Sequence, residues 1–382
     1  MLLTCCRYFP SICQCSRTIC SLKLFSGERD NSFLKHHEQF NLQHTTKRHY
    51  GTPLSDPENK GGQQRGVNFD TLGSWNNRLD MPIMMNESIK RGNLIPEIPF
   101  EHVGIDSLLG RRKVNEDRYF MEKISPTLLC FAVFDGHGGS VVSDFVSSTI
   151  TDHIKFWLLR ETDLCLVLRQ AFIDVNNMLA RHLYFYSLDT KEFQAGTTAT
   201  VCLLRDGIEL AIGHVGDSRV ILCREGLALR LSEDHVPENH REKDRVHQRG
   251  GIISHNSQGV WQVNGRLSMT RSLGDIELKK YGVTADPYLT TKNLKHGKDA
   301  FLVLTTDGVN FVLNDQELID IICCCSTPQE AASFVTDQAL HFGSEDNSTA
   351  IVIPLGAWGK YRTTLRAIPY SFGRNLVRGR YS

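Results

Sequence analysis

The stretch TATVCLLRDGIELAIGHV, residues 198–215, constrains the fold of this 382-residue chain more than any other segment. Two apolar runs of strand length flank Asp206 and Gly207, a pair that is typical of tight hairpin turns. Because a hairpin joins antiparallel neighbours, the sequence favours antiparallel sheets over the parallel sheet of a doubly wound fold. Further short runs rich in apolar residues and bounded by Gly and Asp lie at 128–134, 219–224, 300–305 and 349–354.

Helical patterns lie between these runs. Apolar residues recur at helix spacing over 141–150 and 164–179. The sequence TPQE, which begins at Thr327, is a capping box with proline at the first helical position and predicts a helix that runs to about Phe342. The economical way to bury the apolar faces of both kinds of element is an α+β fold with two packed antiparallel β-sheets flanked by α-helices, a four-layer αββα sandwich.

Composition divides the chain into segments of different character. Up to Gly27 there is no acidic residue, and Arg and Lys are interleaved with Leu, Ile, Phe, Ser and Thr, which is typical of a mitochondrial transit peptide. After Asp346 no acidic residue remains, while several Lys and Arg follow. We therefore predict a transit peptide over 1–27, a disordered linker over 28–66, an N-terminal arm packed on the domain over 67–100, a folded domain over 101–355 and a basic, solvated C-terminal tail over 356–382.

The placement of the cysteines argues against a disulfide scaffold and against a zinc site. The cysteines before Gly27 lack the spacing and the histidine partners of a zinc site, although palmitoylation of Cys5 and Cys6 is an alternative for this segment. The cysteines at 323–325 end a helical pattern, and adjacent side chains point in different directions, so they cannot share a tetrahedral metal. The other cysteines of the domain lie in apolar runs or helical patterns, which fits free thiols in a reducing compartment.

Charge and hydropathy exclude two classes of partner. Lys plus Arg and Asp plus Glu both number 43, so the formal net charge is zero and no overall field attracts nucleic acid or an anionic membrane surface. The longest apolar run, 128–134, is far shorter than the roughly 20 residues needed to span a bilayer. We therefore expect no nucleic-acid partner and no transmembrane segment.

Carboxylates stand at the ends of several strand-like runs. Asp135 follows FAVF, Asp307 follows FLVLTT, Asp346 precedes TAIVIP, and Glu116 and Asp117 precede the first core strand. One aspartate beside glycine is an ordinary turn residue, but carboxylates gathered at strand ends repel one another unless divalent cations lie between them. Oxygen ligands without Cys or His clusters favour Mg²⁺ or Mn²⁺ over zinc. Two such ions, bridged by an aspartate, lower the pKa of a water molecule between them, which is typical of a hydrolytic site.

The residues after Asp135, together with an upstream arginine, fit such a site. Gly136 leaves room for its own carbonyl to reach a metal, and the two glycines after His137 permit a tight turn into a helix. His137 could protonate a departing oxygen, or be a turn histidine that only forms a hydrogen bond. Arg112 offers a guanidinium fork for a phosphate, or is an ordinary surface arginine.

An ordered series of segments in this chain resembles the motifs of the metal-dependent protein phosphatases, type 2C. The segments span residues 104–353 and read GRRKVNEDRY, FAVFDGHGG, AGTTATV, HVGDSRVILCREG, LSEDHVPENHREKDRVHQRGG, VNGRLSMTRSLGD, FLVLTTDGVN and EDNSTAIVI. The resemblance implies the sandwich fold described above. It also implies that 101–355 is the catalytic domain of a protein-serine/threonine phosphatase, which hydrolyses phosphoserine and phosphothreonine with Mn²⁺ or Mg²⁺, two ions per site.

The resemblance, carried over motif by motif, implies a set of metal ligands. Asp135, Asp307 and Asp346 would hold the first metal ion, and Asp135 would bridge to the second. The second ion would also be held by the carbonyl of Gly136 and, through water, by Glu116.

The remaining motif residues imply further roles. Asp117 lies in the motif of the second metal ion, Arg112 would bind the phosphate, and His137 would protonate the leaving alcohol. Asp217 matches the family's acid at a weaker third metal position. A third ion is in doubt, because Phe311 stands where the family often has another acid. Residues 235–270 resemble the mobile flap beside the site, which contributes to substrate choice.

Two flanking segments, WNNRLDMPI and PLGAWGKY, are further similar to a mitochondrial member of the family that dephosphorylates the branched-chain α-keto acid dehydrogenase complex. This similarity implies a phosphoprotein substrate, that complex, in the mitochondrial matrix. Two alternatives stay open: another mitochondrial phosphoprotein as substrate, and a catalytically inactive binding module on the phosphatase fold. Phosphatases that use a cysteinyl or aspartyl phosphate are excluded, because no cysteine is followed six residues later by arginine and no Asp-X-Asp occurs.

Overall fold

The structure is a computed structural model, and it describes residue 88 and residues 95–186 and 193–362. The predicted transit peptide at 1–27 and linker at 28–66 lie outside the described residues, as do most of the arm at 67–100 and the predicted tail after Arg362. The boundaries proposed for these segments stay predictions.

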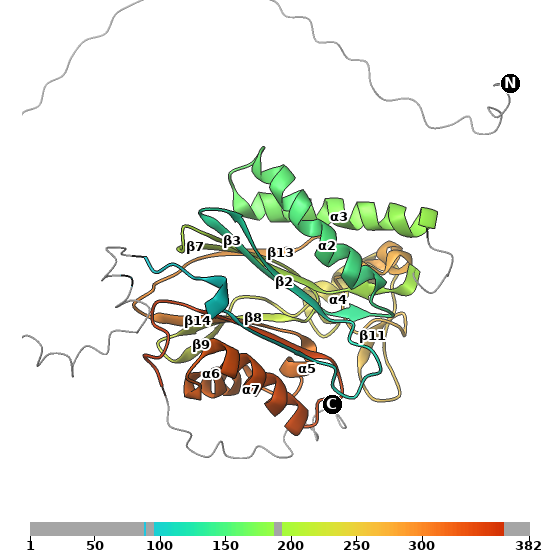
Figure 1. The fold of residues 1–382 in the computed structure, drawn as a ribbon. Coiled ribbons are helices and arrows are strands. Elements are labelled where there is room, and N and C mark those ends of the chain that lie inside the picture. Colours follow the sequence, from blue (N-terminus) through green and yellow to red (C-terminus); the bar gives the residue numbers. More distant parts are fainter. Residues whose placement is uncertain (1–87, 89–94, 187–192, 363–382) are drawn as a thin grey trace, which may run out of the picture. The chain divides into compact units, whose positions relative to one another are not determined.

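Two five-stranded antiparallel sheets form the middle of the domain (Figure 1). The first sheet has the order β1 (Gly104–Leu108), β15 (Ser348–Pro354), β14 (Asp299–Thr305), β8 (Arg219–Arg224) and β9 (Leu227–Arg230). The second has the order β13 (Tyr288–Asn293), β7 (Glu209–Val215), β6 (Ala199–Arg205), β3 (Leu128–Phe134) and β2 (Arg118–Ser125). All pairings within the two sheets are antiparallel, including the β6–β7 hairpin predicted at Asp206.

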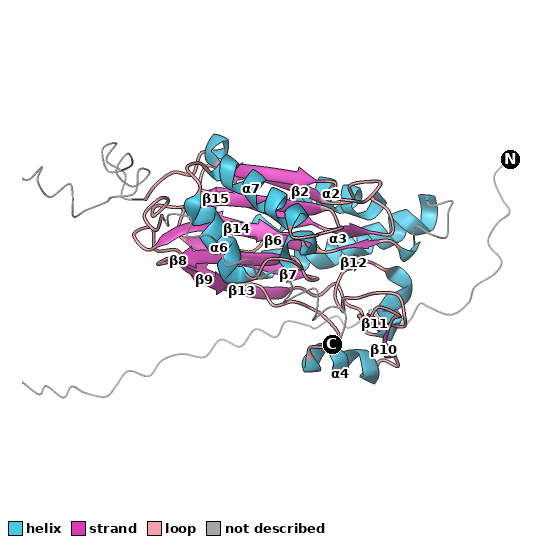
Figure 2. Cartoon of the chain, turned by 90° about the horizontal axis from the view of Figure 1, so that it is seen from below, coloured by secondary structure: helices cyan, strands magenta, loops and turns pink. Residues whose placement is uncertain are grey.

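Helices cover the outer face of each sheet, and a second view agrees with the first (Figure 2). Helices α2 (Val141–Leu158) and α3 (Leu164–Tyr186) pack on the second sheet. Helices α5 (Asp307–Asn310), α6 (Asp315–Cys324) and α7 (Pro328–His341) pack on the first, and a short 3₁₀ helix, η2 (Phe100–His102), precedes β1. The predicted α+β fold, with two antiparallel sheets flanked by helices, is confirmed.

Burial on both faces explains why the central strands are apolar throughout. In β3, Phe131 and Val133 pack in the core between the two sheets, whereas Cys130, Ala132 and Phe134 pack against α2 and α3. Strands β14 and β15 alternate in the same way between the inter-sheet core and the core under α6 and α7. Since successive side chains point to opposite faces, every position of β14 and β15 and all of β3 except Leu129 are buried.

The edge strands were not predicted, because their sequences are mixed. Strand β2 reads RYFMEKIS and β13 reads YLTTKN, and neither has a fully buried position. Strands β1 and β9 at the edges of the first sheet are short and mostly half-buried or exposed. Strands that keep one side near water carry polar residues and therefore lose the apolar pattern.

The segment predicted to be the flap, residues 235–270, shares a small apolar core with the residues up to Val283, and we call residues 235–283 the flap below. It contains α4 (His240–Gln248), β10 (Ile253–His255), β11 (Trp261–Val263) and the 3₁₀ helix η4 (Ile276–Tyr281). Its apolar core consists of Val246, Val263, Leu267, Met269, Leu278 and Val283. A three-stranded sheet of β4 (Gly136–His137), β5 (Gly196–Thr197) and β12 (Leu273–Gly274) connects the flap to the segment after β3.

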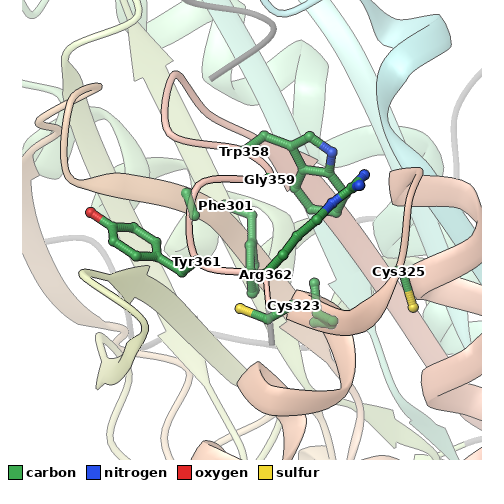
Figure 3. A pocket seen from close by; sticks show the side chains of 9 residues that line it. Phe301, Cys323, Cys325, Trp358, Gly359, Tyr361 and Arg362 are labelled. Atoms are coloured by element: carbon green, nitrogen blue, oxygen red, sulfur yellow. The ribbon is translucent and has the colours of Figure 1, made fainter. Parts of the chain in front are cut away.

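The packed chain continues beyond Leu355. Ala357 and Trp358 are buried in the core under α6 and α7, and the Trp358 ring meets that of Phe301 edge to face, with centroids 5.6 Å apart. Residues 356–358, which the composition assigned to a solvated tail, therefore belong to the packed domain. Figure 3 shows a small cavity at this place, where the side chains of Cys323 and Cys325 point in different directions. Both thiols are free, as are those of Cys130, Cys202 and Cys223, for which free thiols were predicted.

Two distant segments of the described chain, at Ile95 and at Gly356, approach the same turn at Gly207, at the end of the sandwich away from Asp135. His296 joins them, because its Nε2 donates to the carbonyl of Gly207 at 2.6 Å and its Nδ1 accepts from the backbone N–H of Gly356 at 3.1 Å. Gly207 also lies against Ile95, since a Cβ at Gly207 would be 2.9 Å from the Ile95 side chain. Within the described residues, no helix is both long and apolar enough to cross a membrane.

Two buried histidines stack beside the second sheet. The rings of His214 and His235 have centroids 5.0 Å apart and are almost fully buried. His214 bonds Thr200 Oγ1 at 2.8 Å and the Gly216 carbonyl at 3.0 Å, while His235 Nδ1 accepts from the Gly216 N–H at 3.1 Å. Burial lowers the pKa of His214 to about 4 and, together with the neighbouring His214, that of His235 to about 2. Both rings are therefore neutral in the folded protein near neutral pH.

This pair predicts a loss of stability in mild acid. Below the ordinary histidine pKa of about 6.5, the unfolded chain binds a proton at each ring that the folded chain does not bind. Each histidine should therefore lower the free energy of unfolding by about 1.4 kcal/mol per pH unit as the pH falls from about 6 toward 4. We expect His235→Gln to reduce this slope in denaturant titrations at pH 6.5, 5.5 and 4.5. The exposed His341→Gln is the control, and an unchanged slope in His235→Gln would contradict the assignment.

Candidate active site

The predicted acidic residues meet at one end of the sandwich. Asp135 follows β3, Asp307 opens α5 just after β14, and Asp217 follows β7. The side chains of Asp135 and Asp307 share a hydrogen bond, and Asp217 acts electrostatically on Asp135. Asp346, just before β15, is close enough to raise the pKa of Asp307. The fold thus brings together carboxylates from four distant parts of the sequence.

Asp117 joins the same cluster from the segment before β2. Its Oδ2 accepts hydrogen bonds from Thr306 Oγ1 at 2.9 Å and from Thr349 Oγ1 at 2.6 Å. Burial raises the pKa of Asp117 to about 7, against the lowering effect of the two threonines, and the charges of Asp307 and Asp346 raise it further. The two threonines therefore hold this carboxylate beside the residues that follow β14 and precede β15.

Burial and mutual repulsion raise the pKa of the other acids as well. Burial raises the pKa of Asp217 to about 7, with Asp307 and Asp234 adding to it. Burial, followed by the charges of Asp307 and Asp117, raises the pKa of Asp135 well above its ordinary value. The pKa of Asp307 is raised by burial and by Asp346. A set of carboxylates held in this way is stabilised in its ionised form by a cation.

The donor atoms of this cluster fit divalent cations with oxygen ligands. Oδ1 of Asp117, Asp217 and Asp307 are each buried without a hydrogen-bond partner in the described structure. Buried polar atoms are normally paired, so three carboxylate oxygens without a partner in one cluster fit the binding of divalent cations there. No group of three or more His, Cys, Asp or Glu side chains among the described residues is already arranged as a complete ligand set, so the fit rests on these oxygens.

Glu116 and Gly136 lie side by side at the edge of the cluster. A Cβ at Gly136 would be only 2.6 Å from the carbonyl oxygen of Glu116. Glu116 Oε2 accepts from the Gly139 N–H at 3.1 Å, and the Glu116 N–H donates to Asn347 Oδ1 at 2.9 Å. Asn347, the residue after Asp346, therefore holds the segment that carries Glu116 close to Asp346.

Arg112 lies at the exposed rim of the cluster. Its Nη2 donates to Asp346 Oδ2 at 2.5 Å, and its side chain is 60% exposed. The guanidinium group is thus accessible from solvent and contacts Asp346, one of the predicted metal ligands.

His137 lies in β4, with one ring nitrogen bonded and the other free of protein partners. Nε2 is 3.1 and 2.9 Å from the two carboxylate oxygens of Asp275, and Nδ1 has no hydrogen-bond partner in the described structure. Burial lowers the pKa of His137, but the carboxylate of Asp275 more than offsets this, so the pKa lies above its ordinary value. The ring is held in one orientation by a buried acid.

Phe311 stands at the end of α5, where the family often has an acid, and its side chain is largely exposed. Asp217, the predicted ligand of a third ion, nevertheless lies within the cluster. The side-chain amide of Asn310, the residue before Phe311, donates to the backbone carbonyl of Asp217, with 3.4 Å between Nδ2 and the oxygen. Residue 311 therefore contributes no carboxylate to the predicted third position.

Several residues that complete the site were not predicted. Thr198 Oγ1 accepts from the Asp135 N–H at 2.9 Å, and Thr306, Thr349, Asn347 and Asp275 hold the acids and His137 as described above. These residues lie inside the motifs AGTTATV, FLVLTTDGVN, EDNSTAIVI and SLGD. These motifs indicated which segments contribute to the site. They did not indicate which threonine, asparagine or aspartate bonds which acid, because the bonded partners are far apart in the sequence.

Solved structures share this fold. A serine-threonine phosphatase 2C from Toxoplasma gondii has a TM-score of 0.59 and 22% identity, over 66% of this chain and 94% of that one. A sex-determining protein of C. elegans has a TM-score of 0.60 and 24% identity, over 70% of each chain. At this identity the likeness concerns the fold alone.

Sequence comparison gives the family. The chain is 49% identical to Protein phosphatase 1K, mitochondrial, of Xenopus laevis, over 83% of this chain and 84% of that relative. It is 32% identical to Protein phosphatase 1L of Bos taurus, over 67% of this chain and 73% of that relative. The family model described as Protein phosphatase 2C matches residues 102–348. The chain therefore belongs to the protein phosphatase 2C family.

Proposed function

We propose that this protein phosphatase 2C-type serine/threonine phosphatase works with two Mn²⁺ or Mg²⁺ ions held by the acidic cluster. The observation that carries the proposal is the set of buried carboxylate oxygens of Asp117, Asp217 and Asp307 that have no hydrogen-bond partner among the described residues. When bound, the ions would activate the attacking water near neutral pH and balance the negative charge of the phosphate.

The ligands would be distributed as the family motifs imply. Asp135, Asp307 and Asp346 would hold the first ion, and Asp135 with the carbonyl of Gly136 would hold the second. Glu116 would reach the second ion through water.

Two further acids have subordinate positions in this proposal. Asp117, which Thr306 and Thr349 hold in place by hydrogen bonds, would lie near the second ion and add negative charge there. Asp217 would belong to a weaker third position, for which Phe311 contributes no ligand.

Arg112 and His137 would act on the substrate itself. Arg112 is exposed at the rim and donates to a carboxylate, and the same fork of N–H groups fits a phosphate. His137 would pass a proton from its ring to the oxygen of the departing serine or threonine as the phosphorus–oxygen bond breaks. A catalytically inactive binding module, the alternative reading, would not need the complete set of acids together with these two residues.

For the substrate, we propose the branched-chain α-keto acid dehydrogenase complex in the mitochondrial matrix. The Xenopus laevis relative is named as mitochondrial, and the first 27 residues of this chain have the composition of a transit peptide. The identity of the complex rests on the resemblance of the two flanking segments. Another mitochondrial phosphoprotein is the alternative.

Asp307→Asn should separate the metal requirement from effects on folding. Removing one of the repelling carboxylates should leave the melting temperature of the metal-free protein unchanged or raised, because the repulsion falls. The rise in melting temperature on adding Mn²⁺ should be lost. Turnover of a phosphoserine peptide with Mn²⁺ should fall by at least about 10²-fold, a barrier increase of about 2.7 kcal/mol.

The matched control for this variant is Asp286→Asn, which removes a carboxylate outside the cluster. Asp286 pairs with Arg169 at 2.8 Å in a partly exposed position. This control should keep both the Mn²⁺-induced stabilisation and the turnover of wild type. The two-metal proposal is wrong if Asp307→Asn retains turnover within about threefold of wild type, a barrier change below 1 kcal/mol.

His137→Ala should slow turnover in a manner that depends on the leaving group. An alkoxide leaving group needs a proton, whereas nitrophenolate leaves readily without one. We expect a loss of about 10²-fold on a phosphoserine peptide and a clearly smaller loss on nitrophenyl phosphate. Steady-state kinetics on both substrates measure this, and equal losses would count against the acid role.

The cellular assignment has its own test. A fusion of residues 1–50 to a fluorescent protein should label mitochondria, and a diffuse cytosolic signal would reject the transit peptide. In mitochondria that lack this protein, phosphorylation of the branched-chain decarboxylase component should rise. Unchanged phosphorylation in a phosphoproteomic comparison would redirect the substrate without affecting the enzymatic assignment.

A further inference from the structure

Asp275 is a buried carboxylate that the predicted metal site does not use. It lies between β12 and η4 and is 3% exposed. Both of its oxygens lie within hydrogen-bond distance of His137 Nε2, at 3.1 and 2.9 Å. The two residues are 138 positions apart in the sequence.

The carboxylate of Asp275 is itself held in place. Ser272 Oγ donates to its Oδ2 at 2.6 Å, and Lys279 Nζ donates to the carbonyl of Ser272 at 2.6 Å. The backbone N–H of Asp275 donates to the carbonyl of Ala195 at 2.9 Å. The backbone at Asp275 has a φ of 45° and a ψ of 45°, in the left-handed region, which a non-glycine residue seldom adopts. Such backbone strain persists where the surroundings fix the residue, and it is often found at functional sites.

The small sheet brings the pair together. Gly196 in β5 lies opposite His137 of β4 on one side and opposite Gly274 of β12 on the other. A Cβ at Gly196 would be 2.1 Å from Asp275 Oδ2 and 2.5 Å from His137 Nε2. Only glycine leaves room for this hydrogen bond, so three distant segments meet around it.

We propose that Asp275 is the positioning residue for His137, an inference that rests on the acid role given to His137 in the proposed function. A carboxylate at Nε2 requires a proton on that nitrogen, which fixes the ring orientation and leaves Nδ1 to face the reaction. Nδ1 is the ring atom without a hydrogen-bond partner among the described residues. In the reacting state the ring carries a proton on each nitrogen. The proton on Nδ1 would pass to the departing oxygen, which takes the electron pair of the breaking phosphorus–oxygen bond, while the water oxygen forms the new bond to phosphorus and releases a proton to solvent; Nε2 keeps its own proton.

A purely structural role makes a different prediction. If the contact only ties the flap to the domain, its loss would affect all substrates alike through stability or substrate binding. If Asp275 positions the acid, its loss must reproduce the dependence on the leaving group that loss of His137 produces. The two roles are therefore separable by kinetics.

The test compares Asp275→Asn with His137→Ala on a phosphoserine peptide and on nitrophenyl phosphate, with Mn²⁺ saturating. Asparagine keeps the shape of the side chain but removes the negative charge beside Nε2 that stabilises a ring protonated on both nitrogens, the form in which Nδ1 can donate. We expect kcat for the peptide to fall by about 10 to 10²-fold with KM unchanged within about twofold, and kcat for nitrophenyl phosphate to change by less than about threefold. The double variant should be no slower than His137→Ala alone, because both changes remove the same proton transfer.

Two further variants keep the test decisive. Ser272→Ala removes one donor to the Asp275 carboxylate and should give a smaller loss with the same preference for the good leaving group. Asp286→Asn should match wild type on both substrates. If Asp275→Asn does not fold, as judged by its thermal melting curve, Ser272→Ala carries the comparison.

The possible failures are distinguishable. Equal losses on both substrates in Asp275→Asn, or additive losses in the double variant, would overturn the positioning role while His137→Ala still shows its preference. If His137→Ala shows no such preference, the acid role itself fails. If wild type lacks Mn²⁺-dependent turnover, the proposed function fails before either question arises.

Discussion

Burial of the central strands on both faces is the constraint on which the rest of this structure depends. Strands β3, β6, β14 and β15 are covered by the opposite sheet on one side and by helices on the other. Moving any of them by one residue would exchange the two apolar faces and disturb both cores at once. The positions of the residues at the ends of these strands are therefore fixed by the packing of the whole domain. Asp135 directly follows β3, Asp307 lies two residues after β14, and Asp346 lies two residues before β15.

The packing energy of the sandwich opposes a strong local repulsion. The acids at its end are buried near one another, and burial and mutual charge raise the pKa of Asp117, Asp135, Asp217 and Asp307. Above the raised pKa values their ionised form lowers the stability of the folded chain, unless a cation is present. Only a rigid scaffold holds such a cluster together. Threonines at positions 306 and 349, which donate to Asp117, and at 198, which accepts from the Asp135 backbone, strengthen it locally.

The sequence predicted those parts of the molecule that have local patterns. The central strands were visible because both of their faces are apolar, and the capping box at Thr327 is present, with Glu330 as its reciprocal partner. The edge strands β2 and β13 could not be predicted, because polar residues interrupt the pattern of apolar residues that indicates a strand. Within the site, the acids and His137 were singled out by glycine-rich strand ends and by resemblance to the family. Their partners were not, because Asp275 and Asn347 act across separations of more than one hundred residues, which no local pattern records.

The bonds of His296 bear on how this enzyme can be attached to other molecules. They join the Gly207 turn, which lies on Ile95, to Gly356, so the described chain enters and leaves the domain at the same pole. The acids lie at the other pole, where β3 and β14 end. A linker or a fused domain attached directly at Ile95 or at Arg362 would therefore be joined on the side remote from the acids. A domain of residues 95–362 that is immobilised through these two points would present its acidic end outward to large phosphoprotein substrates.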